Sequence, residues 1–307
     1  MSKPSLNDYA LLISLSAMFG ASFLLIKISI VEIPTLTLVA ARLLIAAVIL
    51  WVTMKMAGQQ FPRGTKIWIW IIVAAIFGNV LPWWLITWGQ VKVDAGLTAI
   101  LMATMPLATL LLAHVFTVDE KLNIWKILGV MFGIAGVVVL IGYDQLTTLG
   151  EDTIRQYAIA LAAICYGVNA IITKQLIGHP RRAMAASLMI VSLIMVTPFA
   201  ILVDQPWTIA PSIGVVIAVL LLGIFPSALG TLMIFAIVAR QGASFLSQIN
   251  FLVPVFGVLW SYLFLSEQLS LNAFFALILI LVGVALARIN PNILKRKTPK
   301  EPLEERA

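Results

Sequence analysis

The polar residues of this sequence that are best placed to do chemistry are amides and indoles within apolar runs. In the segment NVLPWWLITWGQ (79–90), Asn79 and Trp83 stand four positions apart, which on an α-helix places both side chains on one face. An amide and an indole offer hydrogen bonds and a ring face, but neither is a nucleophile or a proton carrier. We therefore predict that Asn79 and Trp83 line a cavity for a small molecule. The alternative is that they serve only interhelical packing and hydrogen bonding.

Residues of the same kinds recur in other apolar runs. Methionine and aromatic side chains adapt to varied apolar groups, and a few amide or hydroxyl groups orient a ligand. Together they suit a neutral or zwitterionic organic substrate, although Met and Phe at helical spacing also occur simply as core. The further candidates for this cavity are Phe19, Met102, Tyr166, Asn169, Gln248 and Asn250.

Groups that catalysis or metal binding would need are missing from this pattern. The chain has one cysteine, Cys165, and two histidines, and no acidic residue lies deep inside an apolar run. A Gly-rich phosphate loop with its lysine is not present either. We therefore predict that the protein is not an enzyme and that it uses no metal and no cofactor.

The lack of deep carboxylates also narrows the cargo of a membrane carrier. Export of cationic drugs calls for a membrane-embedded Asp or Glu that pairs with charge and exchanges protons. A carboxylate proton relay is thus unsupported, and facilitated diffusion becomes the simplest mechanism. His114 is predicted to be packed and hydrogen-bonded rather than a proton carrier. Arg42 either snorkels or binds a substrate carboxylate, whereas Lys27 is expected to snorkel.

The elements that position these residues are membrane-spanning helices. Hydrophobic residues make up 62% of the 307 positions and charged residues 11%, against about 25% charged in soluble domains. A helix needs about 20 apolar residues to cross the hydrocarbon core, where backbone groups find no other partners. We predict an all-α integral membrane protein embedded in a lipid bilayer. Its ten transmembrane helices are predicted at 9–31, 34–56, 66–89, 94–117, 121–142, 154–176, 181–203, 211–236, 242–265 and 270–289.

The charge distribution predicts the orientation in the membrane. The net charge is +7, and most of the Lys and Arg residues fall on one side of the alternating spans. Because positively charged loops stay in the cytoplasm, we predict that both termini are cytoplasmic. The basic tail is then a solvated segment near anionic lipid rather than a nucleic-acid site. Short loops and the lack of an organelle presequence favour a bacterial inner (plasma) membrane.

The chain repeats itself at an offset near 147 residues. The segment MFGASFLLIK (18–27) aligns with CYGVNAIITK (165–174), and Pro106 aligns with Pro254. Each half holds five predicted helices, an odd number, so the second half crosses the bilayer in the opposite sense. Such inverted repeats are a signature of transporters, whose substrate site lies near the midplane between the halves. The predicted units are the repeats 1–147 and 148–289 and the tail 290–307.

Several local features predict helix shape and packing. Proline inside a helix removes a hydrogen bond and favours a kink. The GxxxG in GVMFG (129–133) predicts close packing within the chain, with dimerisation as the alternative. Asp94 is expected to cap the helix that it begins. Trp84 and Trp88 are expected in lipid-facing packing or an outer aromatic belt. Bends that move during transport are predicted at Pro82, Pro106, Pro226 and Pro254, with fixed helix shape as the alternative.

These residues resemble a known family. FGASF followed by Lys27, AARLL (40–44), GLTAILMATMPL (96–107) and GIAGVVVL (133–140) are similar to motifs of the EamA-type members of the drug/metabolite transporter superfamily. The resemblance covers residues 8–290, and the YddG-type aromatic amino-acid exporters are the nearest group. It implies a ten-helix carrier that exports amino acids or other metabolites. The sequence departs from the common pattern at Phe19, where tryptophan often stands.

Together the residues and the resemblance predict an exporter of neutral amino acids, aromatic ones included, or of similar small metabolites. The mechanism is predicted to be alternating access without ion coupling, and the carrier a monomer that binds no nucleic acid. Two alternatives stay open. One is an exchanger of anionic metabolites, which would need several basic groups facing the cavity, and the other is broad-specificity efflux coupled to protons.

Overall fold

A computed structural model describes residues 4–116, 123–141, 151–176, 178–268, 270–287 and 289. These residues form helices and their connections, with no strand in the described part of the chain. The predicted boundary near 147 and the tail 290–307 lie outside the described residues.

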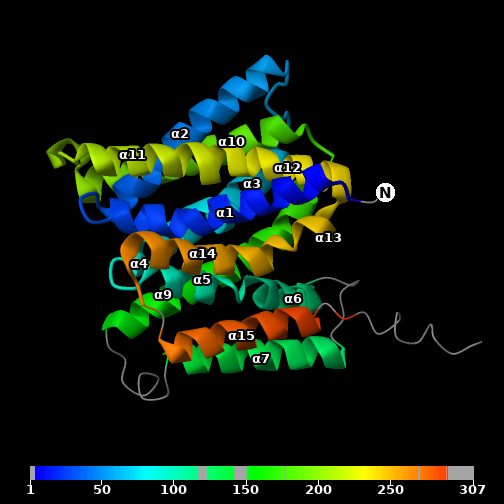
Figure 1. The fold of residues 1–307 in the computed structure, drawn as a ribbon. Helices are drawn as coiled ribbons and strands as arrows, with labels where there is room; N and C mark the ends of the chain where they lie inside the picture. Colours follow the sequence, from blue (N-terminus) through cyan, green and yellow to red (C-terminus); the bar gives the residue numbers. More distant parts are fainter. Residues whose placement is uncertain are drawn as a thin grey trace, which may run out of the picture.

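The helices of the first part of the chain follow the predicted apolar stretches, and Figure 1 shows α1, α6 and α7 running roughly parallel or antiparallel, with α2 inclined to them. They are α1 (Leu6–Ser29), α2 (Thr35–Met56), α3 (Thr65–Ala75), η1 (Ile76–Val80), α4 (Leu81–Gln90), α5 (Ala95–Met102), α6 (Met105–Phe116) and α7 (Ile124–Ile141).

The second part of the chain has the same character. Its helices are α9 (Glu151–Ile172), η2 (Thr173–Leu176), α10 (Arg181–Phe199), η3 (Ala200–Asp204), η4 (Pro206–Thr208), α11 (Ile213–Leu222), η5 (Gly223–Leu229), α12 (Gly230–Gln241), α13 (Ala243–Leu246), α14 (Ile249–Leu265) and α15 (Leu271–Ala287). Seven helical runs are long and apolar enough to cross a membrane, and three shorter apolar helices accompany them. An all-helical membrane protein was predicted, and this fold class is confirmed.

Wide π-helical turns occur beside prolines in three of the long runs, in the interior of two and at the end of the third. The segment η1 ends two residues before Pro82, η5 contains Pro226, and η3 begins two residues after Pro198. A proline leaves the carbonyl four residues earlier without its helical partner, and a π turn accommodates the gap. Pro198 was not among the predicted bends.

The two prolines that the repeat aligns differ in their surroundings. Pro106 lies in the first turn of α6, just after the break at residues 103–104 that separates this helix from α5. Pro254 lies inside α14, which runs unbroken from Ile249 to Leu265. In that run the interruption comes earlier, at residues 247–248.

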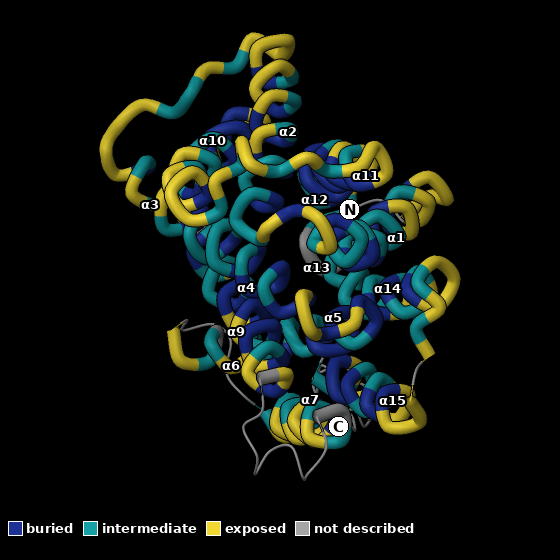
Figure 2. Tube along the Cα trace, turned by 90° about the vertical axis from the view of Figure 1, so that its left-hand side faces the viewer, coloured by how far each residue is buried: buried dark blue, intermediate teal, exposed yellow. Residues whose placement is uncertain are grey.

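The helices α7 and α15 form a pair at the edge of the bundle, side by side in Figures 1 and 2. Glycines bring their backbones together: a Cβ on Gly129 would lie 2.5 Å from the carbonyl oxygen of Gly283. A Cβ on Gly136 would likewise lie 2.7 Å from the Ile280 side chain. The prediction that the GxxxG packs within the chain is therefore confirmed. Figure 2 shows exposed residues along the outer faces of these two helices, where lipid would lie.

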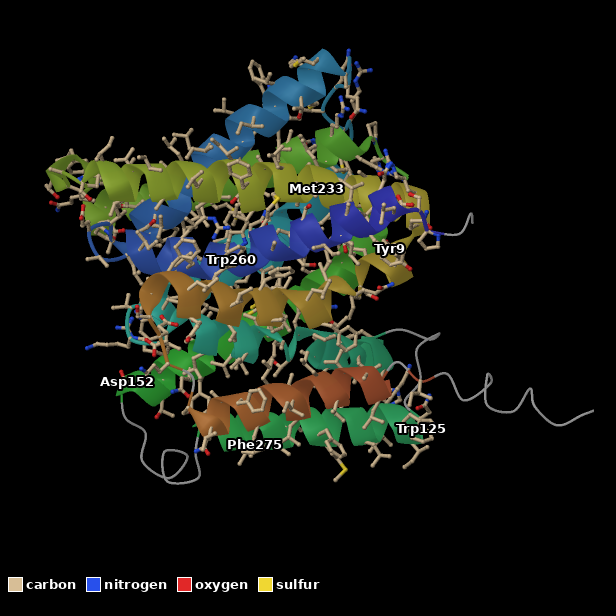
Figure 3. The ribbon with its side chains drawn as sticks, in the orientation of Figure 1. Tyr9, Trp125, Asp152, Met233, Trp260 and Phe275 are labelled. Carbon is tan, nitrogen blue, oxygen red and sulfur yellow. The ribbon has the colours of Figure 1, made fainter. Side chains whose placement is uncertain are left out.

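Figure 3 distinguishes the two ends of the bundle. Tyr9 and Trp125, near the starts of α1 and α7, lie at one end, which we call the N-terminal end. Asp152, near the start of α9, lies at the opposite or distal end. The helix that opens the second part of the chain thus begins where α1 finishes.

Polar contacts connect the helices at the distal end. The Lys27 ammonium donates to the carbonyls of Gln90 and Val93, at 3.0 and 2.9 Å, and lies 3.7 Å from Asp94. Lys27 was expected to snorkel, but it instead serves the free carbonyls at the end of α4. Asp94 makes no capping hydrogen bond with its side chain, so that prediction was wrong.

The start of α5 is capped from the other part of the chain. The backbone N–H groups of Ala95 and Gly96 donate to the two carboxylate oxygens of Glu267, each at 3.0 Å. Glu267 comes directly after α14, so it reaches a helix that it does not precede in the sequence. A carboxylate at a helix start satisfies free donors and complements the helix dipole.

A second distal carboxylate connects the ends of α1 and α11. The backbone N–H and the hydroxyl of Ser212 both donate to Glu32. These hydrogen bonds, the backbone one foremost, hold the pKa of Glu32 below its ordinary value of 4.5.

Candidate functional site

A buried arginine on an aromatic face forms the centre of the candidate site. The guanidinium carbon of Arg42, on α2, lies 3.7 Å from the centroid of a Trp83 ring, on α4. Arg42 is 5% exposed and Trp83 is 8% exposed, so water screens little of this contact. A cation over an indole face is attracted by about 2 kcal/mol or more when both are desolvated.

A proline in the neighbouring segment η5 positions the hydrogen-bond partner of this arginine. Pro226 has no N–H, so the carbonyl of Leu222 lacks its helical donor. The Ser227 hydroxyl fills that place and donates to the Leu222 carbonyl at 2.8 Å. Because the Ser227 hydroxyl proton is donated to the Leu222 carbonyl, the hydroxyl oxygen faces Arg42 as an acceptor. The Nε and Nη2 groups of Arg42 both donate to it at 3.2 Å.

Tyr166, on α9, completes what we call the central cluster: Arg42, Trp83, Tyr166 and Ser227. Tyr166 packs against the same buried core as Trp83. Trp83 and Tyr166 were both predicted site residues, and the structure brings them together.

Asn169 lies one turn further along α9, close to the π turn of η1. A Cβ on Gly78 would lie 2.7 Å from Asn169 Nδ2, so the amide packs directly against the backbone of η1 at this glycine. The Oδ1 atom of Asn169 is buried and accepts no hydrogen bond. Leaving such an acceptor unpaired costs about 1–3 kcal/mol, which makes it a receptor for an incoming donor.

Asn79 is engaged with another helix. Its Nδ2 group donates to Ser192 Oγ, on α10, at 3.0 Å, and the Ser192 hydroxyl donates onward to the Leu188 carbonyl at 2.6 Å. The sequence left open whether Asn79 lines a cavity or makes an interhelical hydrogen bond. That hydrogen bond is present in the structure.

The remaining predicted site residues lie in other surroundings. Phe19 packs in the cluster around Leu12 and Leu15, and Met102 packs against two other core clusters. Gln248 and Asn250 flank the junction between α13 and α14. Met102 shares one of these cores with Tyr166, whereas the described contacts do not connect Phe19, Gln248 or Asn250 to the central cluster.

Two members of the polar network were missed by sequence reasoning. Ser192 and Ser227 are small polar residues in long apolar runs, where serine commonly bonds its own helix. For Ser227 a signal existed, because it directly follows a proline that frees a carbonyl. Arg42 was considered as a carboxylate partner but was not placed in the predicted site.

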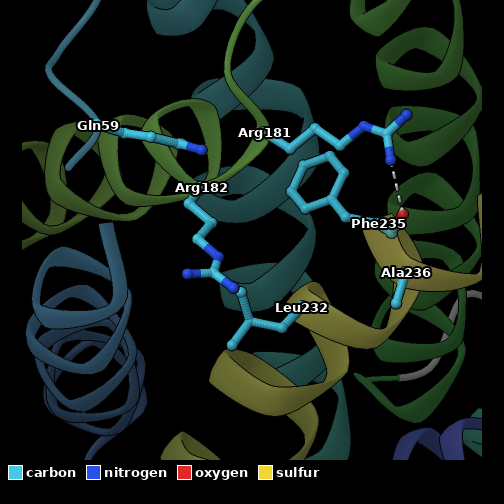
Figure 4. A pocket seen from close by; sticks show the side chains of 6 residues that line it. All are labelled: Gln59, Arg181, Arg182, Leu232, Phe235 and Ala236. Atoms are coloured by element: carbon cyan, nitrogen blue, oxygen red, sulfur yellow. Dashed lines mark hydrogen bonds between the residues drawn. The ribbon is translucent and has the colours of Figure 1, made fainter. Parts of the chain in front are cut away.

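A cavity of about 460 Å³ opens at the N-terminal end of the bundle (Figure 4). Arg181, which lines it, donates to the carbonyl of Phe235 at 3.3 Å. Leu232 and Phe235 pack against the same buried core as Trp83, so the cavity borders the core to which the central cluster belongs. The lining residues are Gln59, Arg181, Arg182, Leu232, Phe235 and Ala236.

A second cavity, of about 280 Å³, is wholly apolar and lies between α1, α11, η5 and α14. Trp260 forms part of its wall and donates its indole N–H to the Ala17 carbonyl at 3.1 Å. It contains no polar group that would orient a ligand. Among the described residues no group of three or more His, Cys, Asp and Glu side chains is placed to hold a metal ion.

Comparison with known proteins defines the class. A family model described as "EamA-like transporter family" matches the chain twice, over residues 8–142 and 155–289. These matches cover most of the chain, so this protein belongs to the EamA-like transporter family, which consists of membrane transporters.

Individual relatives are distant. The chain is 24% identical to an uncharacterized transporter, YoaV, of Bacillus subtilis, over 89% of this chain and 94% of that one. It is 26% identical to a protein named "Probable terminal-alkyne amino-acid exporter" of Streptantibioticus cattleyicolor, over 84% and 83% of the two chains. It is 22% identical to the uncharacterized inner membrane transporter YedA of Escherichia coli, over 96% and 95%.

A solved structure shares the fold. It is described only as "Crystal structure of protein", and it matches with a TM-score of 0.68 at 20% identity, over 94% of this chain and 99% of that one.

Proposed function

We propose that this transporter exports neutral, zwitterionic amino acids, aromatic ones included, by alternating access. The observation that carries the proposal is the central cluster, which offers aromatic rings, a hydroxyl and one cation without a paired carboxylate in the described part of the chain. Such a set favours an apolar or aromatic molecule with polar groups and gives a cationic drug no counter-charge. The relative named as a probable amino-acid exporter supports the same class of cargo.

Alternating access follows from two inverted repeats of five helices each, residues 1–147 and 148–289. The twofold match of the family model supports this division. The opposite starting ends of α1 and α9 support the inversion. In this arrangement the central cluster combines Arg42 and Trp83 from the first repeat with Tyr166 and Ser227 from the second, which is where transporters of this type bind substrate.

The side from which substrate enters follows from the charges. Loops rich in Lys and Arg stay in the cytoplasm, which makes the N-terminal end and its 460 Å³ cavity cytoplasmic. The contacts of Lys27, Glu267 and Glu32 hold the distal end together. We therefore interpret this conformation as closed to the outside, with the cytoplasmic cavity as the entrance.

Transport in this proposal needs no ion gradient and no second subunit. Binding displaces the apolar side chains between the entrance and the central cluster, and the helices bend at the π turns beside Pro82 and Pro226. Bending at Pro106 and Pro254, the pair that the repeat aligns, would accompany this movement in α6 and α14.

An exchanger of anionic metabolites is the second candidate function. The observation that favours it is the pair Arg181 and Arg182, which line the 460 Å³ cavity, together with the buried Arg42 of the central cluster. Inorganic phosphate and phosphorylated compounds therefore belong in the same assay.

The test is counterflow in liposomes that contain the purified protein, with labelled amino acids, phosphate and organic cations, with and without a proton gradient. We expect exchange of phenylalanine and other neutral amino acids in both conditions. Trp83→Ala should reduce it strongly, whereas Trp84→Ala, a neighbouring indole on another face of α4, serves as the matched control. Wild-type protein that exchanges only phosphate or cations would overturn the proposal.

A further inference from the structure

Arg42 is a buried cation that the protein itself does not neutralise. Within the described residues no carboxylate forms an ion pair with it, and its polar partners are one hydroxyl oxygen and an indole face. A buried charge without a counter-charge is costly, and the usual remedy is a paired anion. Membrane-embedded cations that lack a protein partner are therefore candidates to bind an anion.

The geometry of the guanidinium leaves one edge for that anion. Its five N–H groups form a rigid fork. Ser227 takes the Nε donor and one Nη2 donor. The Nη1 group has no hydrogen-bond partner among the described residues, so Nη1 and the second Nη2 donor remain. Two parallel donors at the end of a guanidinium match the two oxygens of a carboxylate.

A hydrogen-bond acceptor that lacks a donor lies on α9. Asn169 Oδ1 is a buried acceptor without a donor. Asn169 lies three residues after Tyr166, which packs against the same buried core as Trp83, the residue whose ring lies against Arg42. Residues three apart on a helix are neighbours, with about 5–6 Å between their Cβ atoms. The guanidinium edge without an anion and the buried acceptor without a donor thus both belong to the surroundings of Tyr166.

We propose that Arg42 binds the carboxylate of the substrate and that Asn169 accepts a hydrogen bond from its ammonium group, so that the site recognises both ends of a zwitterion. Tyr166 and Trp83 then contact the side chain. This inference rests on the proposed function and adds the orientation of the substrate and the residues that discriminate against amines and acids.

The role of Ser227 follows as that of a positioning residue. By accepting two donors from one edge of the guanidinium it fixes the plane of the fork and directs the free edge. Its own proton is held by the Leu222 carbonyl that Pro226 leaves free. The bend at Pro226 thus helps to set the orientation of the Arg42 guanidinium.

The experiment compares three labelled probes in liposome counterflow: phenylalanine, phenylalaninamide, which lacks the carboxylate, and 3-phenylpropionate, which lacks the ammonium. Wild-type protein is expected to prefer phenylalanine over both. Arg42→Gln should lower the preference for phenylalanine over the amide by about tenfold or more, as loss of a charge-assisted hydrogen bond predicts. Asn169→Leu should instead lower the preference for phenylalanine over the acid.

The matched control is Arg155→Gln. The guanidinium of Arg155 also lies 3.7 Å from a tryptophan ring centroid, that of Trp88, but Arg155 belongs to the first turns of α9, near the distal end. This variant removes a similar cation–π contact and should leave both preferences unchanged. A merely structural role of Arg42 would reduce the flux of all probes in proportion and leave the ratios intact, which would overturn the inference.

Binding measurements keep the test decisive if a variant transports too slowly. Ligand-induced thermal stabilisation in detergent is measured for the same three probes, with Arg42→Lys as the variant that retains the charge. We expect phenylalanine to stabilise wild type more than the amide does, and Arg42→Gln to lose that difference. Wild-type protein that neither moves nor binds any amino acid would overturn the proposed function, whereas unchanged ratios in an active Arg42→Gln variant would overturn only this inference.

Discussion

The contact of Glu267 with the start of α5 gives the sharpest quantitative prediction. Its carboxylate accepts the N–H groups of Ala95 and Gly96 at 3.0 Å each, and the nearest alternative, Asp94, makes no capping bond. Loss of an N-terminal cap typically costs about 1 kcal/mol, and loss of a carboxylate at a helix start costs roughly 0.3–1 kcal/mol. Since Glu267 is only half-buried, we expect Glu267→Ala to destabilise the protein by about 1–2 kcal/mol.

The assay is thermal unfolding of purified protein in detergent, with variants that separate charge from hydrogen bonding. For large domains 1 kcal/mol shifts the midpoint by roughly 2 °C, so Glu267→Ala should lower it by about 2–4 °C. Glu267→Gln retains one acceptor but loses the charge, and should lie between wild type and alanine. Asp94→Ala is the matched control, because it removes a carboxylate from the same helix start without removing a cap.

A specific result would refute this reasoning. If Asp94→Ala destabilised the protein as much as Glu267→Ala, the cap would belong to Asp94, as the sequence suggested. If Glu267→Ala left the midpoint unchanged, the distal end would not depend on this contact between the two parts of the chain.

Three further predictions concern other contacts. Gly283→Ala should destabilise the protein by about 1–3 kcal/mol through overpacking, because the new Cβ would lie 2.5 Å from the Gly129 carbonyl oxygen; unfolding in detergent measures this, and a neutral result would contradict the close approach. The Glu32 contact with Ser212 is present at neutral pH and is lost as pH falls through the lowered pKa of Glu32, below its ordinary 4.5, so wild type should lose stability relative to Glu32→Gln only at acid pH. Ser227→Ala should reduce counterflow by removing the acceptor for the buried guanidinium, whereas Ser227→Thr, which keeps the hydroxyl, should retain more of the activity.

Much of the fold followed from the sequence because long apolar runs in a membrane of this kind can only be helices. With no water to bond the backbone, each run must be a helix, and the helices of the described residues lie within or close to the predicted apolar stretches. The GxxxG likewise predicted close packing within the chain, and the structure shows that its partner is α15, where Gly129 approaches Gly283.

The site was harder to predict because its contacts join distant helices. Periodicity placed Trp83 on an inward face of its helix, and Trp83 is buried. It gave no information on which residues of other helices would meet it, so Arg42 was left aside and Ser227 was missed. Capping at the distal end failed for the same reason: Asp94 was adjacent in sequence, but Glu267 was adjacent in space. Local signals identify what a residue offers, and only the packing decides what it meets.

Helix shape and binding chemistry are connected at Pro226, a connection that sequence periodicity alone does not indicate. Pro226 was predicted as a bend, and it lies inside a π turn. The same missing N–H that permits the bend also frees the Leu222 carbonyl, which holds the Ser227 proton and so turns the hydroxyl oxygen toward Arg42. A change in this turn would therefore alter the orientation of the guanidinium without any change in the residues that bind substrate. In a carrier that works by bending its helices, affinity and conformation would then be coupled through one proline.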